Sequence, residues 1–131
     1  YLAKKLQEGG IPVPFDGPRK HEFVASGSVL RERGLHTTDA AKWLLDHGIH
    51  APTVYFPSLV EEALMIEPTE SEGKDMLDRF AEVLIDVLTV DPEKVSSAPQ
   101  NTASSRVDEG KAAKDAILSV REMRRREECH S

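Results

Sequence analysis

The stretch Pro52-Thr-Val-Tyr-Phe-Pro57, continued by Ala63-Leu-Met-Ile-Glu-Pro-Thr-Glu70, decides the fold of this chain. It contains two short apolar runs, Val54–Phe56 and Ala63–Ile66, and each is followed closely by a proline that cannot continue a β-ladder. The connection between the two runs is too short for a helical crossover. The pattern therefore predicts two neighbouring strands that pair antiparallel.

The second run leads directly into an acidic junction, Glu67–Glu72, and then into a helical pattern. Thr69 is placed to cap a helix, and Glu72 follows three residues later, the spacing of a capping box. Apolar residues then recur at helical spacing: Met76, Leu77, Phe80, Leu84, Val87 and Leu88. We therefore predict a helix over residues 71–88 with Phe80 central in its buried stripe.

The remaining segments predict a small two-layer domain. We expect a strand over residues 22–27, a helix that Thr37 or Thr38 caps and that ends at His47, a polar loop over 96–105, a helix over 107–120 and a frayed charged tail over 121–131. Residues 1–20 are expected to be the end of a longer helix and a proline-rich connection. About three short strands with helices on one face indicate a single α+β domain over residues 1–131.

Composition excludes several classes of protein. The 131 residues carry a net charge of −6, whereas a general nucleic-acid-binding protein needs a basic face. No apolar run approaches the roughly 20 residues that span a membrane. The single cysteine, Cys129, cannot form an internal disulfide, so nothing indicates secretion.

The sequence predicts no metal site. His47 and His50 have an H-x-x-H spacing, but zinc needs two more ligands, and a histidine at a helix end is favourable in any case. The glutamates between Glu61 and Glu72 lack the pattern of a calcium loop. Cys129 beside His130 would be a nucleophile only with a positioned base, which a charged tail does not favour.

Several runs match, in the same order, the C-terminal part of a known enzyme. They are His21–Val24, Thr38–Leu45 with Gly48, Ala51–Pro57, Glu62–Glu70 and Asp108–Ala113. On these runs the chain resembles the P-protein of the glycine cleavage system, the glycine-decarboxylating enzyme, over nearly its whole length. The match is closest to subunit 2 of the two-subunit bacterial form.

The resemblance implies the small C-terminal domain of a fold-type-I, pyridoxal-phosphate-dependent enzyme. The whole cytoplasmic enzyme would decarboxylate glycine and pass the aminomethyl group to the lipoyl arm of the H-protein. Its partners would be the large domain of the same chain, the other P-protein subunit and the H-protein. No lysine here sits in a phosphate cup, so the cofactor lysine is expected upstream of Tyr1, and the fragment alone is expected to bind no cofactor and to be inactive.

Polar residues in the matching stretches are the ones expected to face the active site from this domain. They are His21, Tyr55, Glu67, Thr69 and Arg106, with Tyr55 and Arg106 foremost. The loop over 99–106 departs from the family, because Pro99-Gln-Asn-Thr-Ala103 stands where the family shows Pro-His-x-Thr-Pro. A functional role inferred for this loop from the family is therefore not supported by its residues.

Two other interpretations stay open at this point. The chain could be a free-standing α+β interaction module, or the small domain of another fold-type-I enzyme, although the latter lacks the run at 51–70. A domain of a larger enzyme should expose an apolar patch where its neighbour docks. We expect Leu2 or Leu6 to be part of such a patch and the isolated fragment to self-associate.

Overall fold

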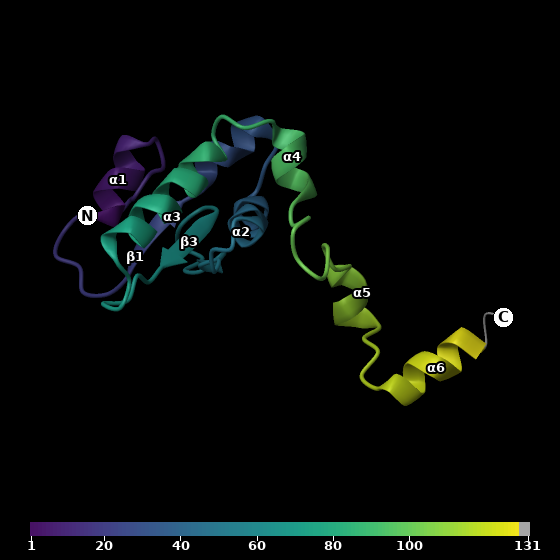
Figure 1. Cartoon of the computed structure of the whole chain (residues 1–131). Helices are drawn as coiled ribbons and strands as arrows, with labels where there is room; N and C mark the ends of the chain where they lie inside the picture. Colours follow the sequence, from purple (N-terminus) through teal and green to yellow (C-terminus); the bar gives the residue numbers. More distant parts are fainter. Residues whose placement is uncertain (129–131) are drawn as a thin grey trace.

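The computed structural model describes residues 1–128, which form a small α+β domain followed by an extended arm (Figure 1). Cys129 and His130 lie outside the described residues. The elements in chain order are α1 (Leu2–Glu8), β1 (Phe23–Ser26), the 3-10 helix η1 (Ser28–Arg33), α2 (Thr37–Asp46), β2 (Thr53–Val54), β3 (Ala63–Ile66), α3 (Lys74–Asp86), α4 (Pro92–Ser97), α5 (Glu109–Lys114) and α6 (Val120–Glu128).

The sheet has three strands in the order β1-β3-β2, and both pairs are antiparallel. The predicted pairing of the second and third strands is confirmed. β2 is shorter than predicted because Tyr55, at φ 59°, leaves the β region. In this register Val24 and Thr53 both lie opposite Met65, so one row of side chains crosses one face of the sheet.

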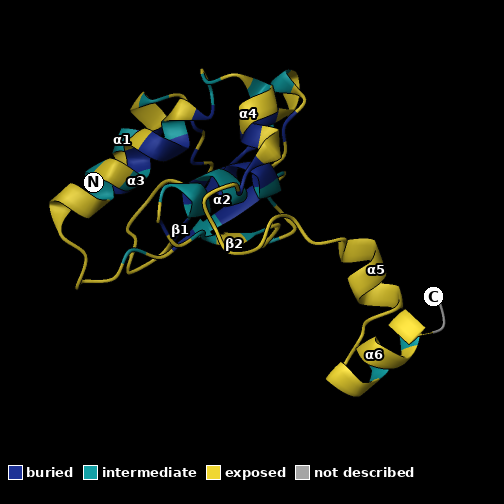
Figure 2. Cartoon of the chain, turned by 45° about the vertical axis from the view of Figure 1, so that its right-hand side comes forward, coloured by how far each residue is buried: buried dark blue, intermediate teal, exposed yellow. Residues whose placement is uncertain are grey.

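The core lies on the other face of the sheet, where α1, α2 and α3 pack. Figure 2 shows the buried residues gathered between the helices and the sheet. The fully buried large side chains include Leu6 of α1, Leu44 of α2, Leu64 of β3 and Leu84 of α3. The structure confirms the small α+β domain with helices on one side of a three-stranded sheet.

The N-terminal helix α1 is part of this core, which corrects the expectation of an exposed helix end. Leu2 is 4% exposed and Leu6 is 0% exposed, and both belong to the domain's own hydrophobic cluster. The two leucines are four residues apart and so share one face, which packs on α3. Gly9 then allows a close approach, because a β-carbon there would collide with the side chain of Ile85.

Helix α2 forms as predicted, but neither threonine caps it. The N-cap is His36, whose N–H donates to the Asp39 carboxylate at 2.8 Å. Thr37 is the first helical residue and is buried, with its hydroxyl donating to the Glu62 carbonyl at 2.8 Å. The helix ends as expected, with Gly48 at φ 71° directly after the C-cap.

Helix α3 starts later than predicted, and Thr69 does not cap it. Its N-cap is Gly73, without a side-chain hydrogen bond, while the Thr69 hydroxyl is 2.7 Å from the Ser71 hydroxyl. Phe80 is not the centre of the buried stripe. That centre is Ala81, Leu84 and Val87, and Phe80 is half-buried at its edge.

Because Thr69 does not cap α3, its replacement should have little effect on stability. Thr69→Ala should change the free energy of unfolding by less than about 0.5 kcal/mol, since its hydroxyl contacts only the exposed Ser71 hydroxyl and exposed sites are usually near neutral. Asp91→Ala should cost about 1 kcal/mol, because the Asp91 carboxylate caps α4 by accepting the Glu93 N–H at 3.1 Å. Urea denaturation of both variants checks this, and an equal loss in both would contradict the structure.

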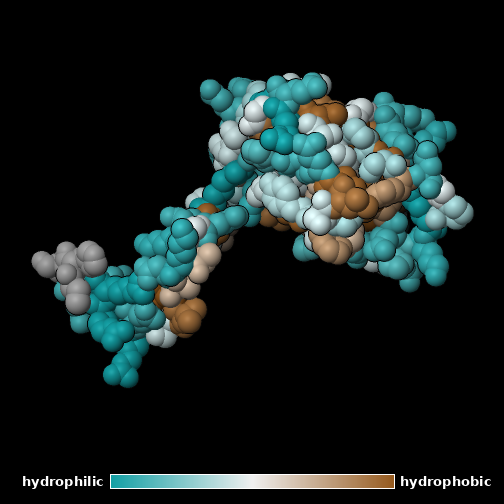
Figure 3. Space-filling view, turned by 180° about the vertical axis from the view of Figure 1, so that it is seen from behind, coloured by the Kyte–Doolittle hydropathy of each residue, from teal (hydrophilic) through white to brown (hydrophobic). Residues whose placement is uncertain are grey.

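The C-terminal arm also differs from the prediction. The expected helix over 107–120 is helical over Glu109–Lys114 and then stops until Val120, where a second helix, Val120–Glu128, runs through the tail that was expected to fray. Arg126 stabilises the arm by pairing with Asp115 at 2.8 Å and Glu122 at 2.6 Å. Figure 3 shows apolar side chains along one side of the arm. Within residues 1–128, no helix has the length and apolar character needed to cross a membrane.

Candidate functional site

A cleft of about 370 Å³ opens at the N-terminal turn of α2, and we call it the α2 cleft. Its walls come from α2, the end of β2 and the segment that leads into the arm. The lining residues are His36, Thr38, Asp39, Lys42, Tyr55, Arg106, Val107 and Glu109. The cleft therefore brings together Tyr55 and Arg106, the two foremost residues of the sequence prediction.

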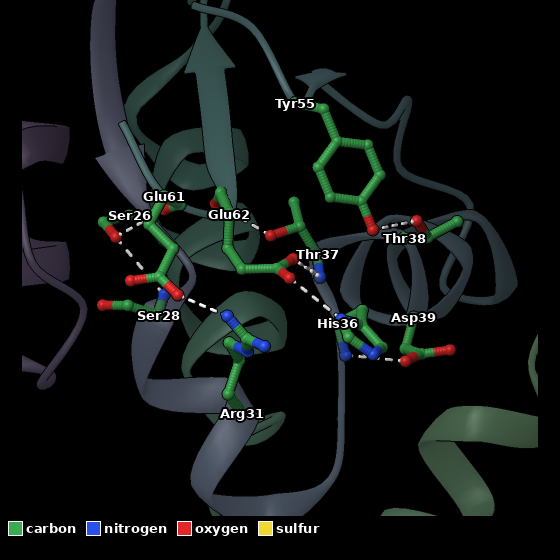
Figure 4. A network of polar contacts seen from close by, with 10 residues as sticks. All are labelled: Ser26, Ser28, Arg31, His36, Thr37, Thr38, Asp39, Tyr55, Glu61 and Glu62. Atoms are coloured by element: carbon green, nitrogen blue, oxygen red, sulfur yellow. Dashed lines mark hydrogen bonds and ion pairs between the residues drawn. The ribbon is translucent and has the colours of Figure 1, made fainter. Parts of the chain in front are cut away.

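The backbone at both ends of the β2–β3 connection is unusual. Tyr55 and Glu62 both have positive φ, 59° and 50°, a conformation uncommon for residues other than glycine. Such residues persist only where the surroundings hold them. The Tyr55 N–H donates to the Ala63 carbonyl at 2.9 Å, and its hydroxyl is 2.7 Å from the Thr38 hydroxyl (Figure 4). The Tyr55 ring is thereby fixed at the wall of the cleft.

The Glu62 carboxylate holds the N-terminus of α2. It lies 2.9 Å from His36 Nδ1 and accepts the Thr37 N–H at 2.8 Å, as Figure 4 shows. Burial opposes ionisation of this carboxyl, but the hydrogen bonds from His36 and Thr37 outweigh burial and lower the pKa of Glu62 below its usual value. A negative charge here also complements the helix dipole. Glu62 therefore supports the floor of the cleft without lining it.

Arg106 ties the segment after α4 to α2. Its Nη2 is 2.7 Å from the Asp39 carboxylate, and its Nε donates to the Ala98 carbonyl at 2.6 Å. The Asp39 carboxylate thus has two partners, the Arg106 guanidinium and the His36 N–H, which donates to it. The guanidinium is fixed at the cleft with its charge partly balanced by one carboxylate.

The loop that departs from the family pattern is held through its main chain. The backbone N–H groups of Gln100 and Asn101 donate to the Asp46 carboxylate at distances of 2.6–2.8 Å. Asp46 is the last residue of α2, so this contact lies at the opposite end of that helix from the cleft. Main-chain donors depend little on which side chains stand at these two positions.

The other sequence candidates lie elsewhere. Glu67 and Thr69 line a second hollow of about 440 Å³, the α3 groove, between β3 and the first turns of α3. Its apolar lining includes Met76, Leu77 and Phe80. His21 is exposed and lines neither hollow. The five candidates are therefore divided between two sites and one exposed position.

Sequence reasoning missed several residues of the α2 cleft. Asp39 and Lys42 lie on the predicted helix, but the ion pair of Asp39 with Arg106 and the position of Lys42 at the cleft depend on the tertiary structure. From the sequence, Glu62 belongs to the connection between two strands and to a group of glutamates without a calcium pattern, and nothing in its context indicates a positive φ. The capping-box spacing from His36 to Asp39 was the available signal, although a histidine is a rare N-cap.

His47 has a local structural partner. Its Nδ1 is 2.8 Å from the Trp43 carbonyl, and its ring lies 4.6 Å from the Trp43 ring. His50 is exposed at the α3 groove. Across residues 1–128, no three or more His, Cys, Asp or Glu side chains gather in a way that could hold a metal ion.

Comparison with known families decides what this domain is. A family model described as "Glycine dehydrogenase, C-terminal domain" matches residues 1–109, most of the chain and both hollows. The chain belongs to the glycine dehydrogenase C-terminal domain family. The resemblance seen in the sequence is thereby confirmed, and the reading as an unrelated free-standing module loses its support.

Three curated relatives of this glycine dehydrogenase domain are each named "Probable glycine dehydrogenase (decarboxylating) subunit 2". One from Thermoplasma acidophilum is 55% identical over 121 residues, 92% of this chain and 24% of the relative. One from Thermotoga petrophila is 48% identical over 92% of this chain and 26% of the relative. One from Staphylococcus saprophyticus is 44% identical over 98% of this chain and 26% of the relative. The chain thus spans about a quarter of the length of these relatives.

Proposed function

We propose that the chain is the C-terminal domain of a glycine decarboxylase, the P-protein of the glycine cleavage system, of fold type I. The observation that carries the proposal is the identity of 44–55% to relatives named as decarboxylating glycine dehydrogenase subunit 2. The whole cytoplasmic enzyme would use pyridoxal phosphate, release carbon dioxide from glycine and pass the aminomethyl group to the lipoyl arm of the H-protein. Its partners would be the large domain, the other P-protein subunit and the H-protein.

The helix N-termini beside the two hollows do not fit the phosphate of pyridoxal phosphate. A phosphate would need free main-chain N–H groups at a helix N-terminus. At α2 the Glu62 carboxylate already accepts the Thr37 N–H. At α3 the first turn is flanked by Glu70, Glu72 and Asp75, whose charges repel an anion. We therefore assign the cofactor and its lysine to the preceding part of the enzyme.

What this domain would supply is one wall of the substrate site. The Tyr55 hydroxyl and the Arg106 guanidinium can both donate hydrogen bonds into the α2 cleft, where a small polar amino acid could be oriented. Asp39 holds the Arg106 guanidinium and Thr38 contacts the Tyr55 hydroxyl, while Glu62 joins the start of α2 to the β2–β3 connection. Glu67, Thr69 and His21 lie outside this cleft, so we give them no part in it.

The proposed activity is tested on the whole enzyme assembled from its subunits with pyridoxal phosphate and lipoylated H-protein. We expect labelled bicarbonate to exchange into the carboxyl group of glycine. The exchange should depend on the H-protein and should not occur with alanine or serine. Amino-group transfer to a 2-oxo acid without any exchange would instead show a different fold-type-I enzyme.

A further inference from the structure

Over one face of the sheet lies a hollow that, within residues 1–128, only strand and loop residues line. The helices α1, α2 and α3 contribute to the core with the inward row Phe23, Ala25, Leu64 and Ile66. The opposite row is Val24, Met65 and Thr53, of which Val24 and Met65 are half-buried and Thr53 is exposed. A two-layer domain therefore presents this side of its sheet to whatever lies next to it.

Two exposed phenylalanines flank this row and enlarge the apolar surface. Phe15 is 47% exposed and Phe56 is 57% exposed, and both line a hollow together with Val24 and Met65. We call Phe15, Val24, Phe56 and Met65 the open sheet face. Its edge adjoins the α3 groove, which Thr53 and Met65 also line. Exposed apolar surface that is contiguous in this way marks a contact site more often than scattered single residues do.

Hydrogen bonds order the segments at both rims of the open sheet face. On one side, Arg19 Nη2 donates to the Phe15 carbonyl at 2.6 Å and closes the segment that carries Phe15. On the other side, Phe56 follows directly after Tyr55, which the Ala63 carbonyl and the Thr38 hydroxyl hold. A surface that is already ordered loses less entropy on docking than a flexible one.

The occupant follows from the length of the relatives. The chain spans only 24–26% of them, so about three-quarters of such a polypeptide lies outside the structure. The charges lining the hollow are one Arg (Arg19) and two acids (Asp16 and Glu22), so no strong field selects a highly charged partner. A mostly apolar, preordered face with a mixed rim suits a permanent neighbour.

We propose that the open sheet face docks onto the preceding part of the same glycine dehydrogenase polypeptide. This inference uses one part of the proposed function, namely that the chain is the C-terminal quarter of such an enzyme. Because Tyr55 and Phe56 are adjacent, a neighbour seated on this face would lie beside the mouth of the α2 cleft. The same contact that buries Phe56 would bring the substrate-binding wall against the rest of the enzyme.

Hydroxyl-radical footprinting of the whole subunit tests the proposal, because the four phenylalanines occupy different settings. Phe23 is buried in the core, Phe80 is half-buried at the α3 groove, and Phe15 and Phe56 are on the open sheet face. We expect Phe15 and Phe56 to be protected to the level of Phe23, relative to the same protein unfolded. Met76 in the α3 groove and Met123 on the arm report whether the neighbour covers those surfaces instead.

Labelling of Phe15 and Phe56 at the rate that their exposure in this domain implies would overturn the proposal. Protection that disappears on dilution would also overturn it, because a second copy would then be the occupant. As a variant test, Phe56→Asp should increase labelling of Phe15 in the whole subunit, while the control Met123→Asp on the arm should not. Glycine–bicarbonate exchange measured on the same preparation separates a failure of docking from a failure of the proposed activity.

Discussion

Leu84→Ala is expected to lower the free energy of unfolding of this domain by about 3–5 kcal/mol, the usual cost of a leucine cavity in a core that cannot collapse. Leu84 is 1% exposed and lies on α3, the longest helix, among the residues that join the helices to the inner face of the sheet. The total free energy of unfolding of a domain of this size is only about 5–15 kcal/mol. The variant should therefore be close to the limit of folding.

Phe80→Ala is the matched comparison, because sequence reasoning ranks it first. Phe80 is half-buried at the α3 groove, so its removal should cost only about 1–2 kcal/mol, part of the value for full burial. Urea denaturation monitored by circular dichroism, with m-values compared, gives the loss in free energy of unfolding for Leu84→Ala and for Phe80→Ala. A larger loss in Phe80→Ala than in Leu84→Ala would show that the buried stripe of α3 is centred where the sequence pattern alone puts it.

Glu62→Ala is expected to lower the free energy of unfolding by about 2–3 kcal/mol. The side chain of Glu62 is 8% exposed, and its loss leaves the Thr37 N–H at the start of α2 without its acceptor. Glu62→Gly separates two effects, because glycine relieves the positive φ of 50° while also removing the carboxylate. We expect Glu62→Gly to be more stable than Glu62→Ala and less stable than wild type.

The same carboxylate makes stability depend on pH. The pKa of Glu62 is lower in the folded protein than its usual value of 4.5, so the unfolded chain binds the proton more readily. The contribution is fully present above the unfolded pKa and is lost as pH falls through the folded pKa. Wild type should therefore lose its advantage over Glu62→Gln as pH falls below about 4.5. An advantage that grows with acidification would contradict the assignment.

The sequence predicts some elements well where a glycine or proline follows the apolar pattern, as Gly48 follows α2 and Pro68 follows β3. The α2 pattern from Ala40 to Leu44, and the apolar run Ala63–Ile66, both appear in the structure with nearly the predicted bounds. The α+β class and the antiparallel pair follow from them. Family membership could likewise be recognised from matching runs, because these reflect many residues in fixed order.

The details that position the site could not be obtained in that way. Thr69 matches a capping-box spacing, yet the chain between Thr69 and Gly73 turns before α3 begins. The burial of α1 depends on α3, which is far away in the sequence. The cleft exists because Tyr55 and Glu62 leave the β region and Arg106 meets Asp39. These are tertiary outcomes that local propensity does not encode.

The role of the α2 cleft as a wall of the substrate site is tested most directly with tyrosine variants of the whole enzyme. The sequence contains two tyrosines, Tyr1 and Tyr55. Tyr55→Phe removes the hydroxyl that lines the α2 cleft beside Thr38, and Tyr1→Phe removes a hydroxyl that bonds the Asp78 carboxylate outside it. We expect Tyr55→Phe to lower kcat/KM for glycine decarboxylation about tenfold, the effect of losing about 1.4 kcal/mol of transition-state stabilisation, with the domain still folded. Tyr1→Phe should leave kcat/KM unchanged. Equal kcat/KM values in wild type and both variants would contradict the claim that the α2 cleft forms a wall of the substrate site.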